Sequence, residues 1–245
     1  MENTSVSQYE TPIDGQILQD YKAVNKKFMA NVFLWMFLAL GVSATAAFLT
    51  LSVPTIFNAI VGSGMLRILF FVPLVFVLIM SFAFKRLSVA GLIAFFILYS
   101  IANGVVFSFI LLVYTSGSVI SCFAGAAVMF GVMAIAGYKT EQDLTTFGRL
   151  LFMALIGMIV VSIINFFMNS EAIDYIIGLI GIMVFTGLTA YDVQKLKNIS
   201  RGIDAEGNEI EHADMKKLTV MGALTLYLDF INLFLSLLRV FGRKN

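Results

Sequence analysis

Two acidic residues stand out because each lies in, or at the edge of, a long apolar stretch. Asp229 is the only charged residue from Leu218 to Leu238, and Asp192 closes another apolar stretch after Thr189-Ala190-Tyr191. A carboxylate at the centre of a bilayer costs about 2.5–3.5 kcal/mol, so it usually faces the protein interior or a wet cavity. If the two carboxylates meet, they would share a proton. Such a pair can sense pH or bind a cation, because carboxylate oxygens are the ligands that calcium prefers.

Each acid also has a purely structural interpretation. Asp229 could be a protonated side chain that is hydrogen-bonded to another helix. Asp192, taken alone, could be a solvated residue at a helix end. With one helix ending near Asp192 and the next starting near Leu218, Asp229 would lie about 11 residues, roughly 16 Å, up the last helix. Contact between the two acids then requires the last helix to begin deeper or the preceding helix to end earlier.

The residues at helical spacing around Asp229 favour a functional position. This face carries small and polar side chains, whereas the other faces carry Leu, Phe, Met and Val; the stripe comprises Gly222, Thr225, Asp229, Asn232, Ser236 and Arg239. Such a pattern predicts a central helix with one face on a pathway. We take Thr225, Asn232 and Tyr191 as polar residues that support the pair.

The elements that must position these acids are membrane-spanning helices. The chain has 245 residues, of which 60% are hydrophobic and only 13% charged. This excludes a disordered chain, a fibrous repeat and a secreted disulfide scaffold, and it argues against a soluble enzyme. The 52 residues from Leu87 to Tyr138 carry no charge, and a spanning helix needs about 20 apolar residues. The single Cys122 excludes an intrachain disulfide and a cysteine zinc cluster, and a net charge of +1 gives no reason to expect nucleic acid as a partner.

The predicted fold class is therefore an all-α membrane protein with seven transmembrane helices in one domain, residues 28–242. The predicted helices span about 28–50, 65–84, 88–113, 119–138, 150–169, 173–192 and 218–239. Residues 1–27 form a polar cytoplasmic tail and residues 243–245 a basic tail. Leu51 to Gly64 contains Pro54, Asn58 and two glycines, and is predicted as a connecting loop.

The positive-inside rule predicts a cytoplasmic amino terminus. Most basic residues lie on the same side of the membrane as the amino terminus. They are Lys22, Lys26, Lys27, Lys85, Arg86, Lys139, Arg149, Lys195, Lys197, Arg201, Lys216 and Lys217. The other side has Arg67, Arg239, Arg243 and Lys244. The basic carboxyl tail fits this rule poorly, since seven spans place it outside. Either the short tail is tolerated there, or the last segment is re-entrant and returns the tail to the cytoplasm.

The closing stretch Gly222-Ala-Leu-Thr-Leu-Tyr-Leu-Asp-Phe-Ile-Asn-Leu-Phe234 resembles the signature of the Bax inhibitor family, also called the transmembrane BAX inhibitor motif family. Thr186 to Gln194, with its Tyr191-Asp192, matches as well, and the similarity runs from about Phe28 to Gly242. The resemblance implies a bacterial-type member with seven helices, of which the seventh is central and wrapped by the other six. It also implies a proton-sensitive calcium leak.

In that family picture, Asp192 and Asp229 form the pH-sensing pair in the pore. A basic residue at the end of the second helix latches onto the aspartate of the sixth helix in the closed state, and here this position falls on Lys85 or Arg86. Arg holds a carboxylate bidentately and Lys does not. No cofactor is expected, and calcium is the ion that would permeate or bind transiently at Asp192 and Asp229.

The leading functional prediction is thus a pH-sensitive calcium leak channel, not an enzyme. Its partners would be the lipid bilayer, calcium, protons and membrane proteins. One alternative is a regulator of stress response, cell death or a membrane protease through protein contacts. Another is an intramembrane aspartyl protease, although the Gly-x-Gly-Asp of those enzymes is replaced by Tyr227-Leu228-Asp229 and their Pro-Ala-Leu is missing. The short loops suit a bacterial inner membrane, and a member in the endoplasmic reticulum or Golgi would look similar.

Overall fold

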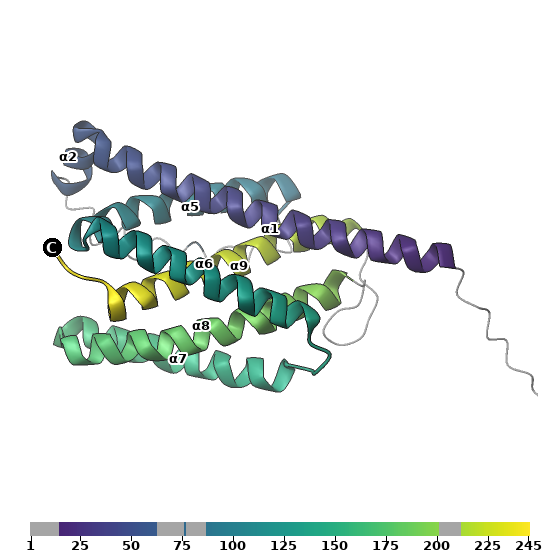
Figure 1. Cartoon of the computed structure of the whole chain (residues 1–245). Helices are drawn as coiled ribbons and strands as arrows, with labels where there is room; N and C mark the ends of the chain where they lie inside the picture. Colours follow the sequence, from purple (N-terminus) through teal and green to yellow (C-terminus); the bar gives the residue numbers. More distant parts are fainter. Residues whose placement is uncertain (1–14, 63–75, 77–86, 201–211) are drawn as a thin grey trace, which may run out of the picture.

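The computed structural model describes residues 15–62, 76, 87–200 and 212–245, and every regular element in these ranges is a helix (Figure 1). The helices are α1 (Gly15–Ser52), α2 (Pro54–Gly62), α5 (Val89–Val113), α6 (Ser116–Lys139), α7 (Thr145–Met168), α8 (Glu171–Ser200) and α9 (His212–Phe241). Six of them, all except α2, are long and apolar enough to cross a membrane. The predicted all-α membrane class is confirmed for the described residues.

The predicted second span, 65–84, lies almost entirely outside the described residues, and so do the latch candidates Lys85 and Arg86. Only Phe76 of this span is described. Its ring lies 5.9 Å from that of Phe95 and 6.3 Å from that of Tyr99, both on α5. This point of the predicted span therefore contacts α5.

The connecting loop predicted from Leu51 to Gly64 is wrong, because Pro54–Gly62 forms the short helix α2. Pro54 occupies the first helical position. There its missing N–H costs no hydrogen bond and its fixed φ suits the helix. The described part of this helix runs to Gly62. The proline here therefore opens a helix and does not mark a loop.

Most of the helices run further into polar sequence than predicted, and α1, α8 and α9 do so the most. α1 begins at Gly15, inside the segment expected as a tail, α8 continues past Asp192 to Ser200, and α9 begins at His212. Charged residues such as Lys195 and Lys197 show where a helix leaves the hydrocarbon. They do not end it, since Lys is a good helix former. At 1.5 Å per residue, the 30 residues of α8 are about 45 Å long.

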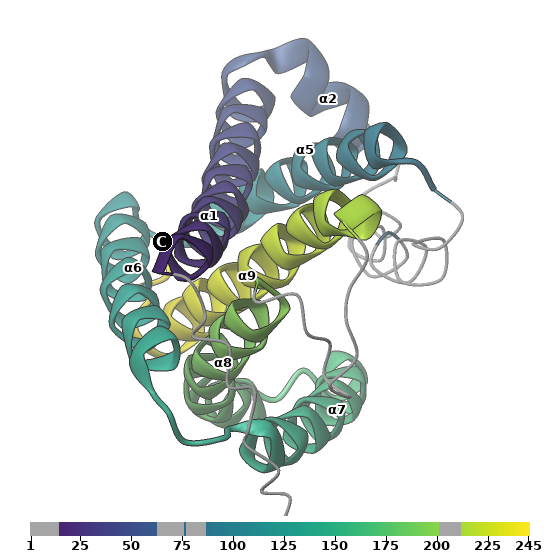
Figure 2. The same ribbon diagram turned by 90° about the vertical axis from the view of Figure 1, so that its right-hand side faces the viewer.

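α9 contacts α1, α5, α6 and α8. In the end-on view of Figure 2 it lies between α1 and α5 on one side and α8 on the other, while α7 covers α8 from outside. The most apolar window of α9 is 61% buried, against 22% for α6 and none for α7. A helix with a polar stripe therefore has the most protein-covered surface among the six candidate spans.

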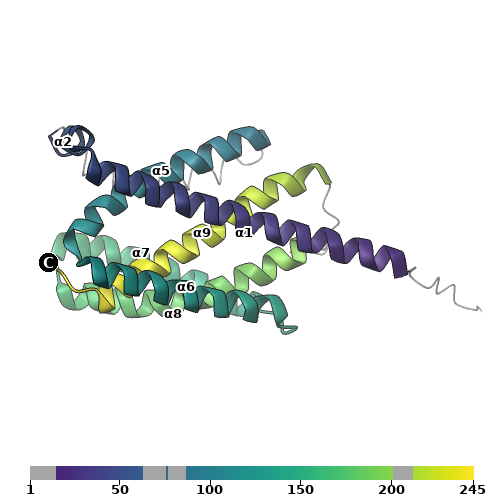
Figure 3. The same cartoon turned by 45° about the horizontal axis from the view of Figure 1, so that its top comes forward.

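The two termini of the helical bundle lie at opposite ends. Figures 1 and 3 show α1 starting at one end and α9 finishing at the other, beside the connection between α5 and α6. Arg243 and Asn245 hydrogen-bond that connection at Thr115 and Val113, with distances of 2.9 Å each. Because α9 is continuous over 30 residues, the last segment does not turn back. The re-entrant alternative for the carboxyl tail is wrong.

Candidate functional site

Asp229 lies near the middle of α9 and is almost completely enclosed. Its side chain retains 5% exposure, and its Oδ2 atom has no hydrogen-bond partner in the described part of the chain. The residues on either side, Leu228 and Phe230, belong to or pack on the hydrophobic core. Most buried polar atoms in proteins are paired, so an unpaired carboxyl oxygen in a core requires an explanation.

Asp192, on α8, lies directly beside Asp229. The two carboxyl groups are within hydrogen-bonding reach of each other and interact electrostatically. The predicted offset of roughly 16 Å between them does not keep them apart, although neither helix is shortened. α8 packs along α9 more extensively than any other described pair of helices, and α9 crosses the bundle obliquely (Figure 3). The crossing brings the middle of α9 to the level of Asp192.

Small residues allow three helices to close tightly around the Asp192 segment of α8. A Cβ added to Gly137 of α6 would collide with the backbone of Ala190. A Cβ on Gly148 of α7 would lie 2.5 Å from the ring of Tyr191, and one on Gly222 of α9 would lie 2.5 Å from Leu196. Close approach through small residues is a common mode of helix packing in membranes. The segment of α8 around Asp192 is therefore packed closely against α6, α7 and α9.

Gln194, two residues after Asp192, fixes the connection between α6 and α7. Its side-chain Oε1 accepts a 2.9 Å hydrogen bond from Leu144 N–H, and its Nε2 donates a 2.7 Å bond to the carbonyl of Gln142. Lys197 adds a 3.5 Å bond to the carbonyl of Thr140. The role of Gln194 is not predicted from the sequence. Its only signal was a polar residue close to Asp192, because the partners come from residues about 50 positions earlier in the chain.

The polar residues expected to support the pair are largely satisfied within their own helix. Thr225 donates to the carbonyl of Met221 at 3.1 Å, and Asn232 donates to that of Leu228 at 2.9 Å. Tyr191 packs against Gly148. Thr225 and Asn232 share a face of α9 with Asp229, but their side-chain hydrogen bonds are made to the backbone of α9 and not to Asp229.

A second polar cluster lies on the opposite face of α9. The hydroxyl of Tyr227, which is fully buried, is 2.8 Å from Ser43 Oγ on α1. Ser43 Oγ is also 2.8 Å from the carbonyl of Ser100 on α5. The rings of Tyr99 and Phe96 pack edge-to-face with the ring of Tyr227, at ring-centre distances of 5.7 and 5.8 Å. This cluster, which the sequence analysis did not foresee, ties α9 to α1 and α5.

The pair offers two carboxylates to a cation. Among the described residues, no group of three or more His, Cys, Asp or Glu side chains is placed to hold a metal ion. Calcium takes 6–8 oxygen ligands in a typical tight site. Two carboxylates alone supply fewer oxygen atoms than such a site requires.

The chain is similar to a known family of proteins. Residues 25–245 match the family model described as "Inhibitor of apoptosis-promoting Bax1". The chain belongs to the Bax inhibitor family. It is 41% identical over 218 residues to the inner membrane protein YbhL of Escherichia coli strain K12, covering 89% of this chain and 92% of the relative. An uncharacterized membrane protein of Streptococcus pyogenes serotype M1 is 33% identical over 222 residues, covering 89% and 93%.

The residues that match the family model include both acidic residues and all six candidate spans. Together with these spans it identifies a multi-pass membrane protein. A further relative, the uncharacterized protein RP147 of Rickettsia prowazekii, is 37% identical over 221 residues, covering 89% and 90%. The names of the Escherichia coli and Streptococcus pyogenes relatives describe a membrane location and not an activity, so the chemistry of the aspartate pair must be argued from its geometry.

Proposed function

We propose that this Bax inhibitor family protein is a pH-sensitive calcium leak channel, gated by the pair Asp192 and Asp229. The observation that carries the proposal is the position of Asp229. Its carboxyl group is enclosed in the interior of a membrane bundle, lacks a partner for Oδ2, and faces a second carboxyl group. Ionisable residues inside a membrane bundle often mark proton or ion pathways, which supports this assignment.

The described state would be the closed one. Asp229 has 5% exposure, and Gly137 and Gly148 bring α6 and α7 against the residues that flank Asp192. Hydrated calcium cannot pass through packing of this density. Conduction therefore requires α8, with the helices attached to it, to shift relative to α9.

Protonation supplies a means to drive that shift. A deprotonated Asp192 would hold the basic latch residue at the end of the predicted second span, either Arg86 or Lys85. Loss of the carboxylate charge would release the latch, so the leak should increase as pH falls. The two carboxyl groups would exchange a shared proton, which makes the gate respond as one unit.

The proposal includes an arrangement in the membrane. The amino terminus is cytoplasmic, as the distribution of basic residues favours, and the membrane is the bacterial inner membrane, as for YbhL. α9 is the central helix, wrapped by the other spans, including the predicted span 65–84. Its contacts with α1, α5, α6 and α8 support this.

Calcium flux into proteoliposomes, measured across pH for the wild type, Asp192→Asn and Asp229→Asn, tests the gate. We expect both variants to change the flux and flatten its pH dependence. Glu141→Gln removes an exposed acid in the connection between α6 and α7 and serves as the matched control, which should keep the wild-type profile. If both Asn variants keep the wild-type flux and pH profile, the gate is not this pair.

Adjacent carboxyl groups would also suit an intramembrane aspartyl protease, which needs one acid and one base. Cleavage of a membrane substrate that disappears in Asp229→Ala would favour that reaction over a leak. Regulation through a membrane protein partner is compatible with the leak. Crosslinked capture of a partner that binds equally well to both Asn variants would place that activity outside the pair.

A further inference from the structure

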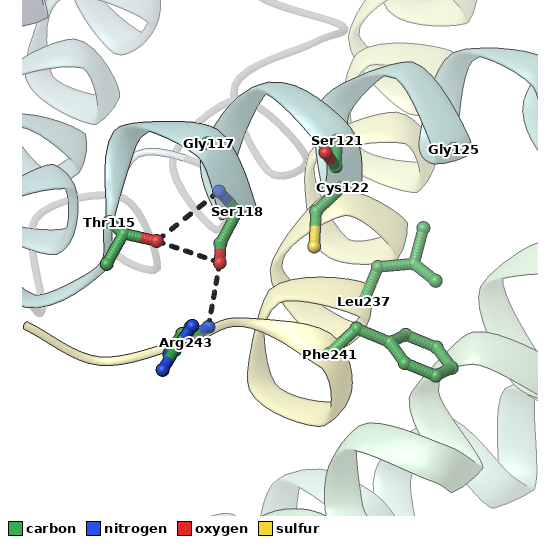
Figure 4. A pocket seen from close by; sticks show the side chains of 9 residues that line it. All are labelled: Thr115, Gly117, Ser118, Ser121, Cys122, Gly125, Leu237, Phe241 and Arg243. Carbon is green, nitrogen blue, oxygen red and sulfur yellow. Dashed lines mark hydrogen bonds between the residues drawn. The ribbon is translucent and has the colours of Figure 1, made fainter.

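A cavity of about 490 Å³ lies between the start of α6 and the end of α9 (Figure 4). Thr115, Ser118 and Ser121 line it from the α6 side, Leu237 and Phe241 from α9, and Arg243 from the tail. α6 begins at Ser116 and α9 ends at Phe241, so the cavity lies where the spans end. Lipid headgroups meet a membrane protein at this level.

Three basic side chains, Arg239, Arg243 and Lys244, lie at this end of the bundle, and acidic side chains of α8 pair with two of them. Arg239 pairs with Asp174 at 3.7 Å, and Lys244 pairs with Glu171 at 3.3 Å. The guanidinium of Arg243 has no carboxylate partner within the residues that the structure describes. Arg243 therefore brings to the rim of the cavity a guanidinium without an acidic side-chain partner, and a guanidinium is well suited to phosphate oxygens.

The backbone of Arg243 is held firmly at the rim. Its N–H donates to Ser118 Oγ at 2.9 Å, and its carbonyl accepts from Thr115 N–H at 2.9 Å. Thr115 Oγ1 in turn donates to Ser118 Oγ at 2.9 Å (Figure 4). The backbone of Arg243 is in place before any ligand arrives, which lowers part of the entropy cost of binding. The exposed hydroxyl of Ser121, on the next turn of α6, makes no hydrogen bond to another described residue and is available to a ligand.

The wall of the cavity combines open space with apolar surface. A Cβ added to Gly117 would meet nothing within 4 Å, and one added to Gly125 would meet only Leu237 Cδ1, at 3.8 Å. On the α9 side, Phe241 is 68% exposed although it is aromatic. A phosphate ion would cover the cation but leave this apolar wall bare, whereas a phospholipid would cover both.

We propose that this cavity binds the headgroup of an anionic phospholipid. The phosphate lies at Arg243 and Ser121, and the first acyl carbons lie against Leu237 and Phe241. The site explains the basic carboxyl tail that fits the positive-inside rule poorly. Acids of α8 neutralise two of its neighbouring cations, Arg239 and Lys244, and the lipid neutralises Arg243. The site is far along the bundle from the aspartate pair, and the inference does not depend on the proposed leak.

Native mass spectrometry of the full chain, purified in detergent with phosphatidylglycerol or phosphatidylcholine of equal chain length, tests the site. We expect the wild type to retain phosphatidylglycerol preferentially. Arg243→Gln should retain it at least about fivefold less, the factor expected for one interfacial cation. Gly125→Leu keeps every charge but fills the cavity, and should lose retention too. Arg149→Gln, which removes an exposed cation at the other end of the bundle, is the matched control and should behave as wild type.

Three results would overturn the proposal. Equal retention of the two lipids would remove the selectivity for an anionic headgroup. Unchanged retention in both Arg243→Gln and Gly125→Leu would place bound lipid elsewhere. Displacement of the lipid by inorganic phosphate alone would make this a phosphate site without a role for the apolar wall. Melting temperatures close to that of the wild type establish that the variants are folded, and unchanged calcium flux would separate the lipid site from the leak.

Discussion

The contact between Gly137 of α6 and Ala190 of α8 offers the sharpest test of the packing around the aspartate pair. A Cβ at position 137 would overlap the carbonyl oxygen, the carbonyl carbon and the Cα of Ala190. Backbone atoms cannot move aside by changing rotamer, so Gly137→Ala must push α6 and α8 apart. Overpacking of this kind costs about 1–3 kcal/mol.

A matched substitution isolates this cost. Gly131 lies on the same helix, and a Cβ there would meet nothing within 4 Å. Gly131→Ala should be neutral or stabilising by up to about 1 kcal/mol, because alanine restricts the unfolded chain and favours the helix. The same gain applies to Gly137→Ala. The difference between the two variants is therefore the overpacking cost alone, about 1–3 kcal/mol.

Thermal unfolding in detergent measures the difference. One kcal/mol shifts the melting temperature by about 2–4 °C for a chain of this size, so Gly137→Ala should melt several degrees below Gly131→Ala. If the contact belongs to the closed state, Gly137→Ala should also raise calcium flux at constant pH, by a factor of about five per kcal/mol. Equal melting temperatures for the two variants would refute the close approach of α6 to α8.

Two further predictions concern the connection between α6 and α7. Gln194→Leu leaves Leu144 N–H and the Gln142 carbonyl without partners. It should lower the free energy of unfolding by about 1–3 kcal/mol and speed amide exchange in this connection. Gln142→Leu keeps both hydrogen bonds, because they involve its backbone, and should have neither effect. Hydrogen bonds from Thr145 hold the pKa of Asp143 below its usual range. The support that the Asp143 carboxylate gives to the start of α7 should therefore be fully present above the ordinary Asp pKa of about 3.9. It should be lost as the pH falls below that value. Amide protection of Thr145, corrected for the intrinsic exchange rate, should follow this loss in the wild type and be insensitive to it in Asp143→Asn.

The spans could be predicted from the sequence wherever charge marks the edge of the hydrocarbon. The range predicted for the third helix, 88–113, differs from α5 by one residue, because Ser88 caps the helix next to charged sequence. The end of α8 was placed eight residues too early, at Asp192. Hydropathy reports where a helix leaves the membrane, while helix propensity decides where it stops, and Gln194, Lys195 and Lys197 all favour continuation.

The site could be predicted in part. Asp192 and Asp229 were found because a carboxylate in an apolar run is costly, a property of each residue alone. Their contact depends on the oblique crossing of α8 and α9, which no local pattern encodes. The same holds for Gln194 and for the bond between Tyr227 and Ser43, whose partners are 184 positions apart. A single sequence does not show which distant segments meet.

The two faces of α9 differ in a way that bears on how the proposed gate would open. On the α1 side, the hydroxyls of Tyr227 and Ser43 are mutually bonded, and Ser43 also reaches α5. On the α8 side, Asp229 retains an unpaired oxygen. Separating the first interface breaks satisfied hydrogen bonds, whereas separating the second lets water reach an atom that already lacks a partner. Because Gln194 and the contact at Gly137 attach α6 and α7 to α8, these three helices would move together at the level of the aspartate pair, while the pairs Arg239–Asp174 and Lys244–Glu171 hold the end of α9 to α8.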